Sequence, residues 1–72
     1  MAEIKAEMAG NVWKITAAVG DTVEDGDTVV ILESMKMEIP IESEYDGTIT
    51  EVCVAEGDAI QDGAVIAIVE ED

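Results

Sequence analysis

The sequence Glu33-Ser34-Met35-Lys36-Met37-Glu38 lies at the centre of a 72-residue chain. Its lysine, Lys36, is one of only three cationic residues, whereas the chain carries eighteen aspartates and glutamates. Lys36 is also the only lysine that has methionine on both sides. A single lysine is usually no more than a solvated surface residue, but methionine is a common choice on adaptable recognition surfaces. The stretch therefore indicates a lysine that is displayed for a partner.

The sequence repeats on either side of this stretch. An offset of 37 residues places residues 1–35 on residues 38–72 and leaves only Lys36 and Met37 unmatched. Ten of the 35 pairs are identical, and several others exchange valine for isoleucine. Two copies are too few for a solenoid, so we interpret the repeat as an internal duplication within one closed domain, residues 1–72, that has a pseudo-two-fold axis. Lys36 then lies at the crossover between the halves, and the chain ends lie near the equivalent point on the other side.

Short apolar or alternating runs bounded by glycine and aspartate predict strands and turns, and no segment has a convincing helical period. Pro40 lacks an N–H group for strand pairing, so we expect its strand at a sheet edge. Val23 lies inside a predicted loop and is expected to fold back into the core. The pattern predicts a small all-β sandwich or barrel, with Lys36 at the tip of a hairpin whose connection is about four residues long. The expected strands are residues 2–7, 12–18, 28–33, 38–43, 48–54 and 64–70, and the longer loops are residues 20–27 and 57–63.

All six glycines fall outside the predicted strands. In each half, a Gly-Asp pair begins a loop that ends at Asp-Gly. Glycine adopts left-handed backbone conformations at little cost, and neighbouring aspartate or asparagine favours the same turns. We therefore expect every glycine to be a turn residue: Gly10, Gly20, Gly26, Gly47, Gly57 and Gly63.

The composition restricts the partners and the location of the protein. A net charge of −15 repels nucleic acid and anionic membranes and favours a partner with a basic docking face, although solubility alone also accounts for it. No apolar run approaches the roughly 18 residues of a membrane span, and the N-terminus has no signal-peptide h-region. Cys53 is the only cysteine, which suits a reducing compartment. We expect a cytoplasmic protein with no nucleic-acid and no membrane partner.

The residue types exclude most catalytic chemistry. No histidine is present, which removes Ser-His and Cys-His pairs and the usual zinc sites. The acidic loops do not match the calcium-binding pattern, and no glycine-rich phosphate loop occurs. We therefore expect no catalytic site and no metal site, which leaves Lys36 as the residue of interest.

Residues Glu33-Ser34-Met35-Lys36-Met37 resemble the E-A/S-M-K-M motif of biotinyl domains, the biotin carboxyl carrier modules of biotin-dependent carboxylases. The resemblance extends over nearly the whole chain. Gly10-Asn11-Val12 is similar to the opening of the domain, and Gly20-Asp21 and Gly57-Asp58 are similar to its two G-D turns. The compact length and the run MAGNVWKI, residues 8–15, resemble the free-standing biotin/lipoyl attachment proteins.

The resemblance implies a flattened β-barrel of two four-stranded antiparallel sheets, a barrel-sandwich hybrid, with biotin joined covalently to Lys36. A biotin protein ligase would attach it from an activated biotinyl adenylate, which the lysine amine attacks. Biotin carboxylase and a carboxyltransferase would be the partners between which the chain carries a carboxyl group, without being an enzyme itself. By the same resemblance the recognition residues are Met35 and Met37, Glu33 belongs to the motif, and Gly26 and Gly47 orient the tip.

Three other functions stay open. Lipoyl domains share this fold but usually read D-K-A at the tip, so lipoate on Lys36, for acyl or aminomethyl transfer, is an alternative or an addition to biotin. The second is an unmodified barrel-sandwich docking module, and the third is an acidic cation-binding protein. The motif together with its context favours biotin.

Overall fold

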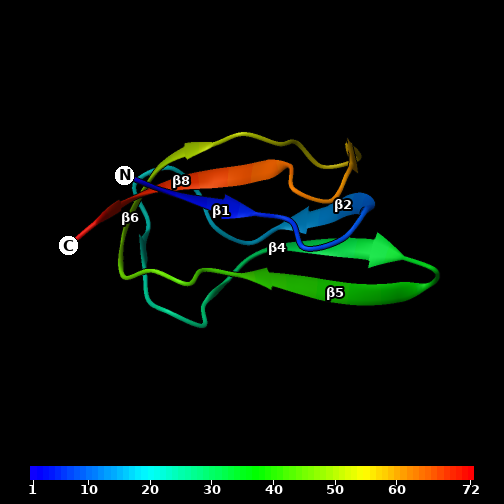
Figure 1. Ribbon diagram of the computed structural model, residues 1–72, viewed down its shortest axis with the longest axis horizontal. Helices are drawn as coiled ribbons and strands as arrows, with labels where there is room; N and C mark the ends of the chain where they lie inside the picture. The colour runs from blue at the N-terminus through cyan, green and yellow to red at the C-terminus, as the bar shows by residue number, and fades with distance from the viewer.

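The computed structural model describes all 72 residues and contains eight strands, β1 to β8, and no helix. The strands form two four-stranded sheets, in the orders β1-β8-β6-β3 and β5-β4-β2-β7, and every pairing is antiparallel. This confirms the expected all-β fold (Figure 1). None of its elements is a helix that could span a bilayer. The strand bounds are Ala2–Lys5, Gly10–Ile15, Thr22–Val23, Thr28–Ser34, Met37–Glu42, Gly47–Val52, Ala59–Ile60 and Val65–Glu71.

All six predicted strands are present, with ends that differ by no more than three residues. The other two strands, β3 and β7, lie inside the predicted loops and contain two residues each. A strand this short carries no periodic signal, so only its pairing with a neighbour identifies it. Val23 in β3 and Ile60 in β7 are buried, which confirms that the first loop folds back into the core.

The 37-residue offset also relates the strands. β2, β3 and β4 are matched residue for residue by β6, β7 and β8, and β1 is matched by the last four residues of β5. The offset therefore exchanges the two sheets, because it converts the order β1-β8-β6-β3 into β5-β4-β2-β7. The equivalent of the hairpin between β4 and β5 is the open junction between β8 and β1, where the two chain ends lie (Figure 1).

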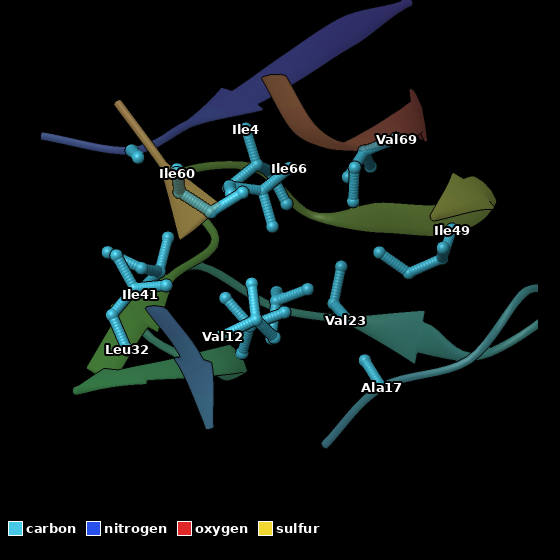
Figure 2. Packing of buried hydrophobic residues seen from close by; sticks show 14 residues of the cluster. Ile4, Val12, Ala17, Val23, Leu32, Ile41, Ile49, Ile60, Ile66 and Val69 are labelled. Atoms are coloured by element: carbon cyan, nitrogen blue, oxygen red, sulfur yellow. The ribbon is translucent and has the colours of Figure 1, made fainter. Parts of the chain in front are cut away.

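A core of 14 buried apolar residues fills the space between the sheets. Figure 2 shows side chains of both sheets pointing toward one another there. Many of them form repeat-related pairs: Ile4/Ile41, Val12/Ile49, Val23/Ile60, Val29/Ile66, Val30/Ala67 and Leu32/Val69. Ser43 takes the position of Ala6 in the other half, and its buried hydroxyl donates to the Tyr45 carbonyl at 2.7 Å and accepts from the Tyr45 N–H at 3.1 Å. The one polar side chain of the core is thus satisfied locally.

Reciprocal backbone hydrogen bonds join the two halves. The Gly20 N–H donates to the Ile49 carbonyl at 2.8 Å, and the Ile49 N–H donates to the Asp21 carbonyl at 2.9 Å. The repeat-related bonds, between the loop before β7 and both backbone groups of Val12, are 2.8 Å long. Each Gly-Asp loop therefore completes the pairing of a strand that belongs to the other half.

Each of these loops is fixed by its own aspartate. Asp21 Oδ2 accepts a hydrogen bond from the Ala18 N–H, and Asp58 Oδ2 accepts one from the Ala55 N–H, both at 2.9 Å. Such side-chain bonds to nearby backbone stabilise turns. Four of the glycines lie in these loops or at their ends and have positive φ, as expected for turn residues: Gly20, Gly26, Gly57 and Gly63.

The prediction that Gly10 and Gly47 are turn residues is wrong. They are the first residues of β2 and β6. A Cβ on Gly47 would overlap the carbonyl oxygen of Glu70 and lie 2.9 Å from its carbonyl carbon, and a Cβ on Gly10 would lie 3.0 Å from the carbonyl oxygen of Glu33. The two contacts are repeat-related. Glycine is needed at both positions because two strands approach closely, not because the backbone turns.

Each sheet has one edge formed by a two-residue strand and one edge formed by a longer strand with a single partner. β1 pairs only with β8, and β5 pairs only with β4. Pro40 lies in β5 opposite Ile31, which confirms the predicted edge position. An edge strand tolerates proline because one side of its backbone has no ladder to complete.

Replacement of Gly47 by alanine is expected to lower the free energy of unfolding by about 3 kcal/mol, because the added Cβ forces β6 away from β8. Gly10→Ala, at the repeat-related position with the looser contact, is expected to lower it by about 1 kcal/mol. Urea unfolding followed by circular dichroism measures both values. Equal losses for the two variants would contradict the difference in strand spacing.

Candidate functional site

The hairpin between β4 and β5 has a connection of only two residues. β4 ends at Ser34 and β5 begins at Met37, which leaves Met35 and Lys36 between them. Both have positive φ, 53° and 64°, and no other non-glycine residue does. Two consecutive positive φ values are typical of a type I′ turn, whose twist matches that of the flanking strands. The expected four-residue connection is too long, because strand pairing continues to the residues at the base of the turn.

This turn holds ordinary side chains in a conformation that asparagine and glycine favour. A left-handed backbone is roughly 1–2 kcal/mol less favourable for each such residue. The six paired positions of β4 and β5 maintain it. Backbone strain that the surrounding structure maintains clusters at functional sites. The turn therefore indicates that the display of Met35 and Lys36 matters more than local stability.

The side chains of the tip lie in solvent. Met35 is 92% exposed and Met37 is 63% exposed, and Lys36 is exposed between them. The only ion pair of the structure joins Lys5 Nζ to Glu3 Oε1 at 3.8 Å, so the Lys36 amine has no carboxylate within ion-pair distance. Methionines this exposed contribute little to packing and are available to a partner.

The register of the hairpin adds a pair of carboxylates below the tip. Glu33 lies directly opposite Glu38, and both are exposed. Like charges in this position are slightly destabilising. The structure thus brings the predicted residues Glu33, Met35, Lys36 and Met37 together and adds Glu38, which the reasoning from sequence missed. The expected hairpin already held this signal, because a four-residue connection over residues 34–37 also places positions 33 and 38 opposite each other.

Gly26 and Gly47, which we expected to orient the tip, lie at the other end of the molecule. The Gly26 N–H donates to the Ser43 carbonyl at 2.8 Å, just beyond the end of β5. Gly47 pairs with Glu71, next to the C-terminus. Any effect of these glycines on the tip is therefore transmitted through the barrel and not by contact.

The tip projects freely. Neither of the two hollows in the surface includes a residue between positions 33 and 39. The molecule measures 35 × 18 × 18 Å, and the tip lies at one end of the long axis, with both chain ends at the other (Figure 1). A primary amine in this position can accept a covalent group and present it to the pocket of another protein. The residues present therefore fit an attached prosthetic group.

Comparison with known proteins gives a consistent result. A family model described as "Biotin-requiring enzyme" matches residues 1–69. The biotin/lipoyl attachment protein of Bacillus subtilis is 58% identical over 38 residues, which cover 53% of this chain and 52% of that protein. A biotinylated protein TB7.3 homolog of Mycolicibacterium smegmatis is 51% identical over 39 residues, which cover 54% of this chain and 55% of that protein. The matched regions thus span about half the length of these curated relatives.

A solved structure agrees over a longer region. The crystal structure of the urea carboxylase of Kluyveromyces lactis superposes with a TM-score of 0.91 and 35% sequence identity. The superposition covers 96% of this chain and 6% of the urea carboxylase chain. The fold described above therefore also occurs as a small part of a much larger carboxylase.

The strain in the turn can be tested by substitution. Met35→Asn is expected to raise the free energy of unfolding by about 1 kcal/mol, because asparagine tolerates the left-handed conformation. Met37→Asn, at a position in β5 without positive φ, is the matched control and is expected to give no gain. Urea unfolding measures both. If Met35→Asn were no more stable than Met37→Asn, the turn would not be strained.

Cys53, the only thiol, gives a prediction about pH. Desolvation by the surrounding atoms, followed by the charges of Glu51 and Glu3, raises the pKa of this exposed thiol above its ordinary value. Because the thiolate is the reactive form, the rate of alkylation by iodoacetamide should rise at a higher pH in the native protein than in the urea-unfolded protein. Glu51→Gln should lower the midpoint, and Glu70→Gln should leave it unchanged. A native midpoint at or below the unfolded one would contradict this assignment.

Proposed function

The chain belongs to the biotin/lipoyl attachment family, as the match over residues 1–69 shows, and from this premise we propose that it is a biotin carboxyl carrier with biotin attached to Lys36. One observation carries the proposal: an exposed lysine without an ion-pair partner stands between two exposed methionines on a strained two-residue tip. The names of both curated relatives include biotin. The single lysine at the tip is the natural attachment point, because Lys5 and Lys14 lie within strands.

Attachment requires the Lys36 amine to reach an activated biotin inside a biotin protein ligase. The two-residue turn projects the amine beyond both strands, so that the ligase can enclose it without disturbing the barrel. The amine nitrogen attacks the acyl carbon of the biotinyl adenylate, an amide bond forms, AMP leaves, and the amine loses its protons to solvent or the ligase. Met35 and Met37 flank the reacting nitrogen and supply the apolar contacts that select this lysine.

Biotin, once attached, supplies a ureido ring that accepts and releases a carboxyl group. The protein chain positions this group. The lysine side chain and the attached group form a flexible arm on the order of 10 Å or more in length. The strained turn, held by the pairing of β4 and β5, keeps the base of this arm fixed. A tethered group reaches two successive active sites at a high effective concentration, without diffusing away.

The partners of this carrier are a biotin carboxylase and a carboxyltransferase. The similarity to a small part of a urea carboxylase supports a carboxylase partner in general. The chain is a non-catalytic carrier in this proposal, and its lone cysteine suits a cytoplasmic location. The acidic surface, with a net charge of −15, favours basic docking faces on these partners.

Lipoate is the second candidate for Lys36. The name of the Bacillus subtilis relative includes lipoyl as well as biotin, which favours dual modification. The exposed Met35 and Met37 favour biotin as the main group, since lipoyl domains resemble this one in fold but usually carry a different tip sequence.

Expression with biotin and a biotin protein ligase, and separately with lipoate and a lipoyl ligase, tests the proposal. Intact mass and peptide mapping are expected to show one biotinyl group on Lys36 and none on Lys5 or Lys14. Lys36→Arg is expected to abolish the modification while the protein remains folded, because arginine keeps the charge but offers no acylatable amine at neutral pH.

The two modification experiments also separate the alternatives. A lipoyl group in place of biotin would move the function to acyl or aminomethyl transfer. An unmodified Lys36 in a folded protein would exclude the carrier function and leave a docking module. Modification of Lys5 or Lys14 would show that the tip does not select its lysine.

A further inference from the structure

A groove of about 1110 Å³ runs between the two sheets at the edges formed by β1 and β5. Its lining includes all four residues of β1 and the second half of β5, from Pro40 to Glu42. Ile4 and Ile41, which are repeat-related and buried, form its apolar floor. The groove contains no residue of the tip, so a ligand bound there leaves Lys36 accessible.

The two walls of the groove are unpaired sheet edges. β1 has β8 as its only partner, and β5 has β4. The outward-facing N–H and C=O groups of such strands can pair with an added strand. Pro40 removes one donor from β5, whereas β1 contains no proline. The edge of β1, about 13 Å long at the usual rise per residue, is therefore the better template for an added strand.

The charge of the groove determines which kind of added strand can bind there. Seven of its eighteen lining residues carry carboxylates, among them Glu3, Glu42 and Glu44, and its only cationic side chain is that of Lys5. Lys5 already lies 3.8 Å from Glu3. Carboxylates on an edge also prevent copies of the chain from pairing with one another, and a charge of −15 on each copy adds to that repulsion. A second copy is thus a poor occupant, whereas a basic segment is complementary.

We propose that this groove is a docking site for an extended segment of a partner protein in which basic and apolar residues alternate, and that the segment adds to the edge of β1. Its apolar side chains cover the floor formed by Ile4 and Ile41, and its basic side chains meet the carboxylates on the rim. Docking here would hold the carrier beside a partner enzyme while the tip moves between active sites. The site is independent of the group on Lys36.

The test uses the whole chain and a synthetic peptide of about ten residues in which lysine and valine alternate. In a titration of ¹⁵N-labelled protein, we expect amide shift changes confined to β1, β5 and the turns at their ends. A peptide with the same lysines but with proline in place of valine should bind at least about tenfold more weakly, because it cannot form a strand ladder. Biotinylated and unmodified protein should bind equally, so failure of one proposal is distinguishable from failure of the other.

Two triple variants with the same change of charge complete the test. Glu3→Gln/Glu42→Gln/Glu44→Gln is expected to weaken binding about tenfold at low salt, by the loss of three rim charges. Glu51→Gln/Glu56→Gln/Glu70→Gln, outside the groove, is expected to weaken it less than about twofold. Equal weakening by both triples, or equal binding of the proline peptide, would show non-specific attraction to an acidic protein and overturn the proposal. Absence of binding by the lysine-valine peptide would also overturn the proposal. The rim carboxylates would then serve only to keep copies of the chain from pairing with one another.

Discussion

The fold depends on the reciprocal hydrogen bonds between each Gly-Asp loop and a strand of the opposite half. The loop that begins at Gly20 bonds to both backbone groups of Ile49, and its counterpart bonds to both backbone groups of Val12. Each half therefore supplies backbone partners that the other half lacks. Neither half alone supplies hydrogen-bond partners for the backbone of all its own strands. Because buried backbone groups without partners are strongly unfavourable, the duplicated sequence forms one interlocked barrel instead of two separate units.

The position of the tip follows from this symmetry. The offset that exchanges the sheets also relates the hairpin between β4 and β5 to the open junction of β8 and β1. One junction is closed by a two-residue turn and the other is left open at the chain ends. The long paired strands below the turn maintain two positive φ angles that methionine and lysine would not adopt alone. The stability of the barrel thus holds Lys36 in a fixed, exposed position.

The structure therefore presents two separate surfaces with different chemistry. The tip presents a free amine and two thioethers, and the groove between β1 and β5 presents carboxylates and unpaired backbone groups. They share no residue, so attachment of a group at the tip and docking at the groove do not compete. A carrier needs this separation, because the attached group has to leave one pocket and enter another while the protein stays near both.

The sequence by itself determined the repeat, the six longer strands, the edge position of Pro40 and the place of Lys36 and its methionines at a hairpin tip, because each depends on local pattern or on the offset between the halves. It did not determine β3 and β7, the two-residue turn, or the groove. The glycines show why. Gly10 and Gly20 are alike in the sequence, yet one permits a close approach of strands and the other a left-handed turn. That difference is set by the distance to a strand far away in the chain, which only the tertiary structure defines.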